Sequence, residues 1–305
     1  MYQKLKKKNR LIMILILLCL SLLFLWGYTF HKYLSEQEKV KNTIVPSLSD
    51  DYFTSQLILT RNAMKAEQEE KLFYQRWFTY HPEYQEAYNN ERNYYQNVTF
   101  TLEANRLAQL PDYPNGCEAV SAVMLLNYYG VDISIEEYIN NYLPMEEVYE
   151  KDGIRYGPDP SQVYAGDPKD PYRGWGTFAP VLFNSIQNVL KSQTGFSVID
   201  LSSTSLENLI FELPVVIWTT IDYEEATEIY EWQSYDGAKT YTYPKNAHAV
   251  LVVGVDKDNF YINDPLKPES TVQVPKETLE KSYNSMGRQA IGIYRVYNDE
   301  DMLVW

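Results

Sequence analysis

The first thirty residues divide into a basic segment and a long apolar one. Residues 1–10 (MYQKLKKKNR) carry five basic side chains and no acidic one, and residues 11–30 contain no formally charged side chain. Twenty helical residues span about 30 Å, the thickness of a bilayer hydrocarbon core. The basic flank predicts a cytoplasmic N-terminus and an exported remainder. We therefore expect a cytoplasmic segment (1–10) and a single-pass transmembrane signal-anchor (11–30) in the cell membrane.

A cleaved signal peptide is the alternative for this segment. Such peptides have a shorter apolar region, followed by a small-x-small cleavage site. The sequence after Trp26 (GYTFHKYLSEQ) has no Ala-x-Ala pattern, and Cys19 follows two leucines instead of a small residue. The pattern favours the uncleaved anchor, and both alternatives place the bulk of the chain outside the cytoplasm.

Residues 31–96 are polar, contain no glycine and are rich in Glu, Gln, Asn and Tyr. Between residues 50 and 97 apolar and aromatic side chains recur among many charged ones, a pattern typical of helices. We interpret residues 31–96 as an extracytoplasmic helical stalk or linker, with substrate binding as a less favoured alternative. The positions that define this pattern are Leu57, Met64, Leu72, Phe73, Trp77 and Phe78.

Residues 97–305 show helix and strand signals separated by tight turns, which predicts one domain. Residues 118–129 are apolar nearly all round, as in a fully buried helix, and Gly130 follows as its expected end. Ser134 and Glu137 have the spacing of a capping box for a second helix. A third helix fits residues 178–192, with Thr177 as its N-cap.

Strand patterns dominate the later part of this domain. They predict strands at 97–102, 196–200, 214–221, 270–274 and 290–296, a strand pair at 247–264, and a hairpin at 235–243. Because the helices precede the strands in a block, we predict an α+β fold with a mostly antiparallel sheet.

Charge and cysteine content narrow the classes of function. The first ten residues hold five of the 27 Lys and Arg residues and none of the 41 acidic ones, so the rest carries a formal charge of −19. This charge disfavours nucleic acid and anionic lipid as partners. Of the two cysteines, Cys19 lies in the predicted membrane segment, so Cys117 has no disulfide partner in its own domain. No ligand-spaced cluster predicts a metal or another cofactor.

Cys117 lies at the junction of a turn, Pro114-Asn115-Gly116, and the predicted buried helix. The positive end of a helix dipole lowers the pKa of a thiol, and a neighbouring imidazolium lowers it further. Gly116 lacks a side chain where a substrate backbone would approach. Gln109, eight residues upstream, could contribute a side-chain N–H to an oxyanion hole together with the Cys117 backbone N–H.

A cysteine nucleophile needs a base, and the base needs an orienting group. Only His248 shares the predicted domain with Cys117, since His31 and His81 precede it. Asp264 follows His248 by sixteen residues, so a strand pair with a short turn would place the two opposite each other. The carboxylate would accept Nδ1–H and leave Nε2 for the thiol. A buried core histidine and a turn aspartate before Pro265 are the structural alternatives.

These motifs resemble the C39-like cysteine peptidases, a branch of the papain-like superfamily. The resemblance covers about residues 97–300 and rests on QLPDYPNGCEAVSAVMLLNYYG, HAVLVVGVDKDNFYINDP and the order Cys, His, Asp. It implies a papain-like fold, a Cys117-His248-Asp264 triad and Gln109 at the oxyanion. Gly166-Asp167-Pro168 and Gly174-Trp175-Gly176 are similar to a loop between the helices of these enzymes, so we predict that Gly116, Trp175 and Gly176 bind substrate.

The leading hypothesis is a membrane-anchored extracytoplasmic cysteine peptidase that cleaves peptide or isopeptide bonds in a peptide or protein substrate. An acyl transferase of the transglutaminase or transpeptidase type could use the same triad. A non-catalytic surface binding module is the alternative from another class. Trp175, Trp218 and Trp232 could line a cleft, although a tryptophan in such a position is more often part of a core.

Overall fold

The computed structural model describes residues 51–82, 84–86, 89, 99–191, 195–209 and 213–296. The predicted cytoplasmic segment, the signal-anchor and the beginning of the linker lie outside these residues, so they stay predictions. Within the described ranges, no helix has both the length and the apolar character to cross a membrane.

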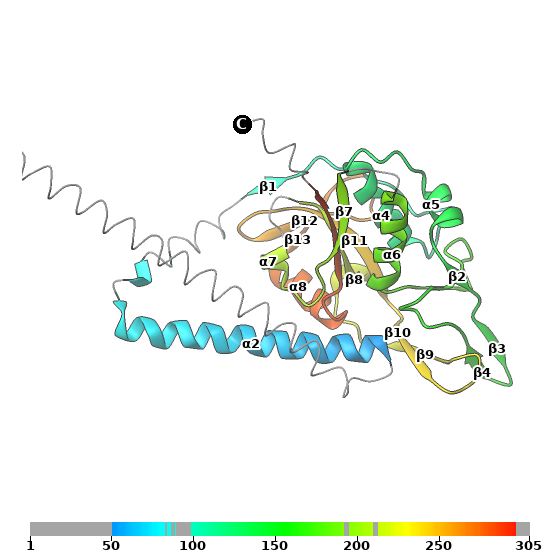
Figure 1. Cartoon of the computed structure of the whole chain (residues 1–305), viewed down its shortest axis with the longest axis horizontal. Coiled ribbons are helices and arrows are strands. Elements are labelled where there is room, and N and C mark those ends of the chain that lie inside the picture. The colour runs from blue at the N-terminus through cyan, green and yellow to red at the C-terminus, as the bar shows by residue number, and fades with distance from the viewer. Residues whose placement is uncertain are drawn as a thin grey trace, which may run out of the picture. The chain divides into compact units, whose positions relative to one another are not determined.

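The centre of the fold is a sheet of seven strands (Figure 1). All its pairings are antiparallel, as the sequence predicts for an α+β fold. β1 (Phe100–Thr101) pairs with β11 beyond the end of β8. The other strands lie in the order β13 (Val272–Pro275), β12 (Asn259–Asn263), β11 (Ala247–Val255), β8 (Val215–Thr220), β14 (Ala290–Arg295) and β7 (Phe196–Asp200).

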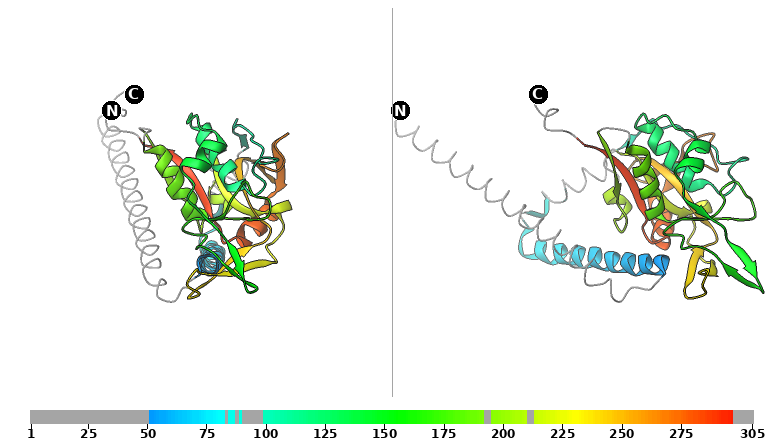
Figure 2. Two further views of the ribbon diagram at one scale, coloured as in Figure 1. Left: turned by 90° about the vertical axis from the view of Figure 1, so that its right-hand side faces the viewer. Right: turned by 45° about the vertical axis from the view of Figure 1, so that its right-hand side comes forward.

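Helices cover both faces of this sheet, which explains why β8 is buried at every position and β11 at all but its two ends. Side chains alternate across a strand; Val216 and Trp218 of β8 join the core of α4, whereas Val215 and Ile217 join that of α8. Figure 1 shows α4 and α6 on one side of the sheet and α7 and α8 on the other, and Figure 2 gives further views. The helices are α4 (Cys117–Tyr128), α5 (Ile135–Asn141), α6 (Ala179–Leu190), α7 (Leu206–Leu209) and α8 (Lys276–Ser285).

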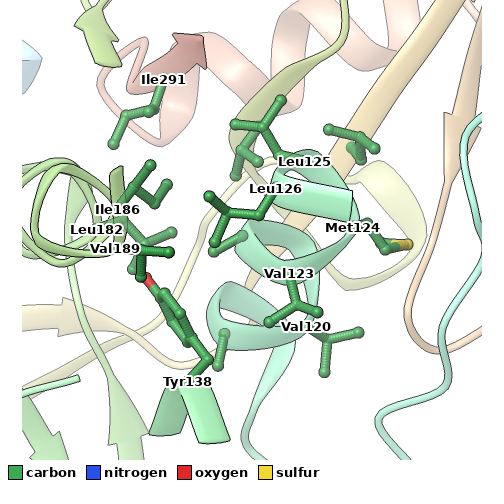
Figure 3. Close-up of a cluster of buried hydrophobic side chains, with 14 of the residues drawn as sticks. Val120, Val123, Met124, Leu125, Leu126, Tyr138, Leu182, Ile186, Val189 and Ile291 are labelled. Carbon is green, nitrogen blue, oxygen red and sulfur yellow. The ribbon is translucent and has the colours of Figure 1, made fainter. Parts of the chain in front are cut away.

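The predicted all-buried helix is α4, in which ten consecutive residues from its first position are buried. Leu126 faces Leu182 and Ile186 of α6, and Tyr138 of α5 closes the cluster (Figure 3). Gly130 follows the helix with a φ of +81°, the left-handed conformation typical of a helix end. α4 thus packs against α5, α6 and the central sheet, and this packing fixes its first turn, where Cys117 lies.

The other predicted helix ends differ in detail. Ser134 caps α5 by accepting a hydrogen bond from the Glu137 backbone N–H, as predicted. α6 begins one residue later than expected, with Phe178 at the N-cap, because the Thr177 hydroxyl donates to the Pro160 carbonyl instead of capping the helix.

Two small sheets lie beside the central one. A hairpin is present around the predicted Asp236-Gly237 turn, but it is longer than the predicted 235–243: its strands are β9 (Ile229–Gln233) and β10 (Thr240–Pro244). β4 (Ile154–Tyr156) and β3 (Tyr149–Lys151) complete this sheet. The second small sheet contains β2 (Met145–Glu146), β5 (Tyr164–Gly166) and β6 (Gly174–Gly176).

The helical pattern between residues 50 and 97 corresponds to α2 (Tyr52–Tyr80). The helix belongs to the same compact unit as the domain predicted to begin at residue 97. Phe53 stacks on Phe178, with ring centroids 5.7 Å apart, and the Arg288 guanidinium makes a bidentate ion pair with Glu67. The first part of α2 is therefore packed on the domain, and the limits of the predicted stalk stay predictions.

Candidate active site

The loop before α4 holds Cys117 at the first position of that helix. Gly116 is the N-cap residue, and its N–H donates to the Tyr113 carbonyl at 2.9 Å. The Asn115 N–H donates to the Pro168 carbonyl, so the loop between β5 and β6 supports the turn from outside. The Cys117 backbone N–H belongs to the first turn of α4, where backbone donors have no partner within the helix.

Gln109 is buried and ties this loop to the other end of the site. Its side-chain Nε2 donates to the Pro114 carbonyl at 2.9 Å, and its backbone N–H donates to the Pro265 carbonyl at 3.1 Å. Its Oε1 is buried with no hydrogen-bond partner in the described part of the chain. Gln109 thus joins the Cys117 loop to the segment that carries Asp264, while its oxyanion role remains a prediction.

His248 and Asp264 form a buried pair. His248 lies at the second position of β11, Asp264 comes directly after β12, and His248 Nε2 is 2.7 Å from Asp264 Oδ1. The two side chains are 2% and 3% exposed, so this contact is shielded from water. The structure brings the predicted base and its predicted orienting group together.

Two details of this pair differ from the sequence prediction. The register pairs Leu251 with Asn263 and shifts at a bulge between Val252 and Gly254. Continued by one residue it places Asp264 opposite Val250, so His248 lies diagonally across, not directly opposite. The farther ring nitrogen, Nε2, therefore reaches the carboxylate, and Nδ1 is the nitrogen left for the thiol.

The environment of Asp264 favours its charged form. Burial raises the pKa of this carboxyl, but the hydrogen bond and charge of His248 lower it, as do the Tyr223 hydroxyl at 2.7 Å and the Leu266 N–H at 2.9 Å. The net result is a pKa of about 2. A carboxylate held in this way can fix the imidazole and stabilise its protonated form.

The Cys117 thiol has hydrogen-bond partners on two residues, Glu118 and Ala249. Its Sγ lies 3.2 Å from Oε2 of Glu118, and the backbone of Ala249, the neighbour of His248, also hydrogen-bonds with it. Ser121, one turn further along α4, donates to the Ala249 carbonyl at 3.0 Å, which holds α4 against the start of β11. The Glu118 backbone also hydrogen-bonds with the thiol. Among the described residues, no hydrogen bond joins the thiol to the His248 ring.

This environment contradicts the thiol activation expected from the helix N-terminus. Burial raises the pKa of the Cys117 thiol well above its ordinary value, and the negative charge of Glu118 raises it further. The hydrogen bond from the Ala249 backbone lowers it but does not compensate. The helix dipole lowers the thiol pKa by less than burial and Glu118 raise it. Cys117 is only 7% exposed, and its sulfur lies against a carboxyl group.

Glu118 is the residue that sequence reasoning missed. It is 2% exposed, and its Oε1 accepts hydrogen bonds from the Thr177 N–H at 3.0 Å and the Tyr243 hydroxyl at 2.9 Å. Burial raises the pKa of this carboxyl, although these donors lower it. A signal was present, because Glu118 is the one charged residue in the mostly apolar run from 117 to 129.

The residues predicted to bind substrate have other neighbours in the structure. A Cβ at Gly116 would lie 2.7 Å from the Tyr113 Cβ, and one at Gly176 would lie 2.1 Å from the Tyr243 hydroxyl. The close approaches at both glycines are therefore internal, and contact with substrate stays a prediction. Trp175 is half-buried, whereas Trp218 and Trp232 belong to the core and do not line a cleft.

The composition of the site points to acid–base and nucleophilic chemistry. It contains a thiol at a helix start, a histidine paired with a carboxylate, and a buried amide beside the same loop. Within the described ranges, no group of three or more His, Cys, Asp or Glu residues could hold a metal ion.

Comparisons with known proteins show which family the chain resembles in sequence and fold. YvpB of Bacillus subtilis, an uncharacterised protein, is 28% identical over 192 residues, which are 61% of this chain and 71% of YvpB. A crystal structure described as that of a candidate C39-like peptidase from Bacillus anthracis is also 28% identical. It matches 66% of this chain and 99% of its own, with a TM-score of 0.57.

A double-glycine-motif protease of an AMS/PCAT transporter, solved with its leader peptide, is 15% identical. The match covers 66% of this chain and 100% of that one, with a TM-score of 0.38, too low to support an argument. The model of the peptidase C39-like family matches residues 92–291, about two thirds of the chain. With its α+β fold and its helix packed on an antiparallel sheet, the chain belongs to the peptidase C39-like family.

Proposed function

We propose that this protein is a cysteine peptidase that cleaves peptide or isopeptide bonds through Cys117, His248 and Asp264. The observation that carries the proposal is the buried His248–Asp264 pair at 2.7 Å, beside the helix start that bears Cys117. A solvent-shielded imidazole held by a carboxylate is the arrangement that a base for a cysteine nucleophile needs.

In the proposed reaction the sulfur attacks the substrate carbonyl after its proton passes to Nδ1 of His248. The protonated imidazole then gives this proton to the leaving amine, and a water molecule, activated by the neutral imidazole, releases the acyl group. Asp264 keeps the ring in place through Nε2. The Cys117 backbone N–H and the second N–H of the Gln109 amide would stabilise the tetrahedral oxyanion.

We also propose that the enzyme acts outside the cytoplasm, anchored by residues 11–30. This part of the proposal rests on the twenty uncharged residues and the basic segment before them. A peptide or protein near the membrane or wall surface would then be the substrate.

The test compares protein N-termini in cells that carry the natural protein with those in cells that carry Cys117→Ala. New N-termini present only with the natural protein are expected; identical sets in both cells would overturn the peptidase assignment. Mass spectrometry of a cleaved peptide in the presence of an added amine separates hydrolysis from acyl transfer. Unchanged ligand binding and cellular phenotype in Cys117→Ala would favour the binding module.

A further inference from the structure

A second titratable group, the carboxyl of Glu118, contacts the thiol of the proposed nucleophile Cys117. Cys117 and Glu118 are adjacent in a helix, where neighbouring side chains normally point about 100° apart and do not face each other. Here the Glu118 side chain turns back, so that Oε2 lies 3.2 Å from the Cys117 sulfur. This conformation therefore needs support from other parts of the fold.

That support comes through the other carboxyl oxygen. Oε1 accepts from the Thr177 N–H, which follows β6, and from the Tyr243 hydroxyl of β10. A Cβ at Gly176 would lie 2.5 Å from this oxygen, so the glycine makes room for it. Because both donors point at Oε1, any proton on the carboxyl belongs on Oε2, the oxygen that faces sulfur.

The pair has two chemically distinct states. With Glu118 ionised, the thiol donates S–H to Oε2, and a thiolate would place two negative charges within 3.2 Å. With Glu118 neutral, Oε2–H can donate to a thiolate, a charge-assisted hydrogen bond that favours the ionised sulfur. The first state is suited to a resting enzyme and the second to an attacking one.

We propose that Glu118 is a catalytic residue of this site, and that it must be neutral when Cys117 reacts, with Oε2–H donating to the thiolate. This inference rests on the proposed role of Cys117 as nucleophile. The proton balance is simple: the S–H bond breaks, its proton goes to Nδ1 of His248, and Glu118 keeps its own proton. The active form thus carries the former thiol proton on Nδ1 of His248, whose Nε2–H stays on Asp264, together with one proton on Glu118 and none on sulfur.

The surroundings of the carboxyl are consistent with this assignment. Burial raises the pKa of Glu118, which makes the neutral form accessible. Besides His248 and Asp264, the titratable groups near the pair are Tyr243 of β10 and Tyr164 of β5, and burial together with the charges of Glu118 and Cys117 raises the pKa of both phenols well above the ordinary range. Both tyrosines therefore stay protonated, and none of the salt bridges of the described residues involves Glu118.

The test is the pH dependence of Cys117 alkylation by iodoacetamide in Glu118→Gln, followed by mass spectrometry of the peptide that contains Cys117. A glutamine keeps an oxygen for both donors and presents N–H to the sulfur at every pH. We expect the apparent thiol pKa to fall by at least about one unit, roughly tenfold more thiolate below that pKa. Glu137→Gln, an exposed carboxyl on α5, is the matched control and should leave the profile unchanged.

An unchanged or raised thiol pKa in Glu118→Gln would overturn the proposal. It would mean that Glu118 has only a structural role, since removal of its charge would not favour ionisation of the Cys117 sulfur. If Glu118→Gln does not fold, Tyr243→Phe provides the second test. It keeps the ring packed on Phe178 and removes one donor that favours the ionised carboxyl, so the thiol pKa should again fall, by less. A raised or unchanged value there also contradicts the proposal.

Alkylation requires no peptide turnover, so this result is independent of the proposed peptidase activity. If the alkylation profile shifts in Glu118→Gln but the natural protein shows no detectable cleavage, the coupling between Glu118 and the Cys117 thiol stands and the proposed peptidase activity is wrong. If the natural protein cleaves peptides but the alkylation profile does not shift in Glu118→Gln, the peptidase activity stands and the role of Glu118 is wrong.

Discussion

Replacement of Asp264 by asparagine tests the buried pair with a magnitude that follows from the structure. The Asp264 carboxyl accepts three hydrogen bonds, from His248, Tyr223 and Leu266, and has a pKa of about 2 instead of the ordinary 3.8. One pKa unit corresponds to about 1.4 kcal/mol, so the native contacts stabilise the ionised carboxyl by about 2 kcal/mol. Asp264→Asn should lower the free energy of unfolding by about this amount at neutral pH.

The pH dependence follows from the direction of the shift. A carboxyl whose pKa is lower in the folded state stabilises the protein above its unfolded pKa, and this contribution is lost as pH falls through the folded pKa. The difference between Asp264 and Asp264→Asn should therefore be nearly constant from about pH 7 to pH 5 and fall to less than about 0.5 kcal/mol at pH 2.

Urea unfolding followed by tryptophan fluorescence at several pH values measures this difference, with the exposed Asp112→Asn as control. A penalty for Asp264→Asn that is the same at pH 7 and pH 2 would show that its cause is packing, and would refute the electrostatic reasoning. Asp264→Asn should also slow peptide cleavage at least about tenfold, because the amide cannot stabilise the imidazolium by charge.

Two further variants test contacts that support the site. Glu67→Gln breaks the bidentate pair with Arg288, whose side chain is 3% exposed, and should lower the free energy of unfolding by about 1–3 kcal/mol in urea unfolding, because a buried charge loses its partner. Gly176→Ala would push a methyl group against the Tyr243 hydroxyl at a φ of +129°, so it should destabilise the protein and change the pH profile of Cys117 alkylation.

Matched controls make both results interpretable. Glu69→Gln removes an exposed carboxyl of the same helix, and a loss as large as that of Glu67→Gln would argue against the buried pair. Gly153→Ala also places alanine at a positive φ, +78°, with no atom within 4 Å of the new Cβ. An equal effect of the two alanine variants would mean that backbone strain, not the collision beside Glu118, is responsible.

The elements that could be predicted from the sequence are those whose signals are local. The run from 118 to 129 predicts a helix buried on all sides because its polar residues are too few to face water, and α4 confirms it. The apolar run at 214–221 predicts a buried strand and residues 247–264 predict a strand pair, and β8, β11 and β12 confirm them, with helices on both faces of the sheet. The sixteen-residue spacing of His248 and Asp264 predicts that they meet, and they do.

What could not be predicted depends on contacts between distant segments. The bulge before Gly254, where a Cβ would lie 2.4 Å from the Phe100 carbonyl oxygen of β1, shifts the register by one residue and so places Asp264 opposite Val250, on the same face as His248. The donors to Glu118 lie 59 and 125 residues away, so the sequence shows a charged residue in this helix but not the groups that bind it. The contact between α2 and the domain joins residues 221 positions apart.

The central claim is that His248 ionises the Cys117 thiol. The direct test is the rate of iodoacetamide labelling of Cys117 near pH 6 in the natural protein and in His248→Ala, again read from the peptide that contains Cys117. Because burial and Glu118 disfavour the thiolate, labelling should be at least about a hundredfold faster when the imidazole is present. Equal rates in the two proteins would contradict the account.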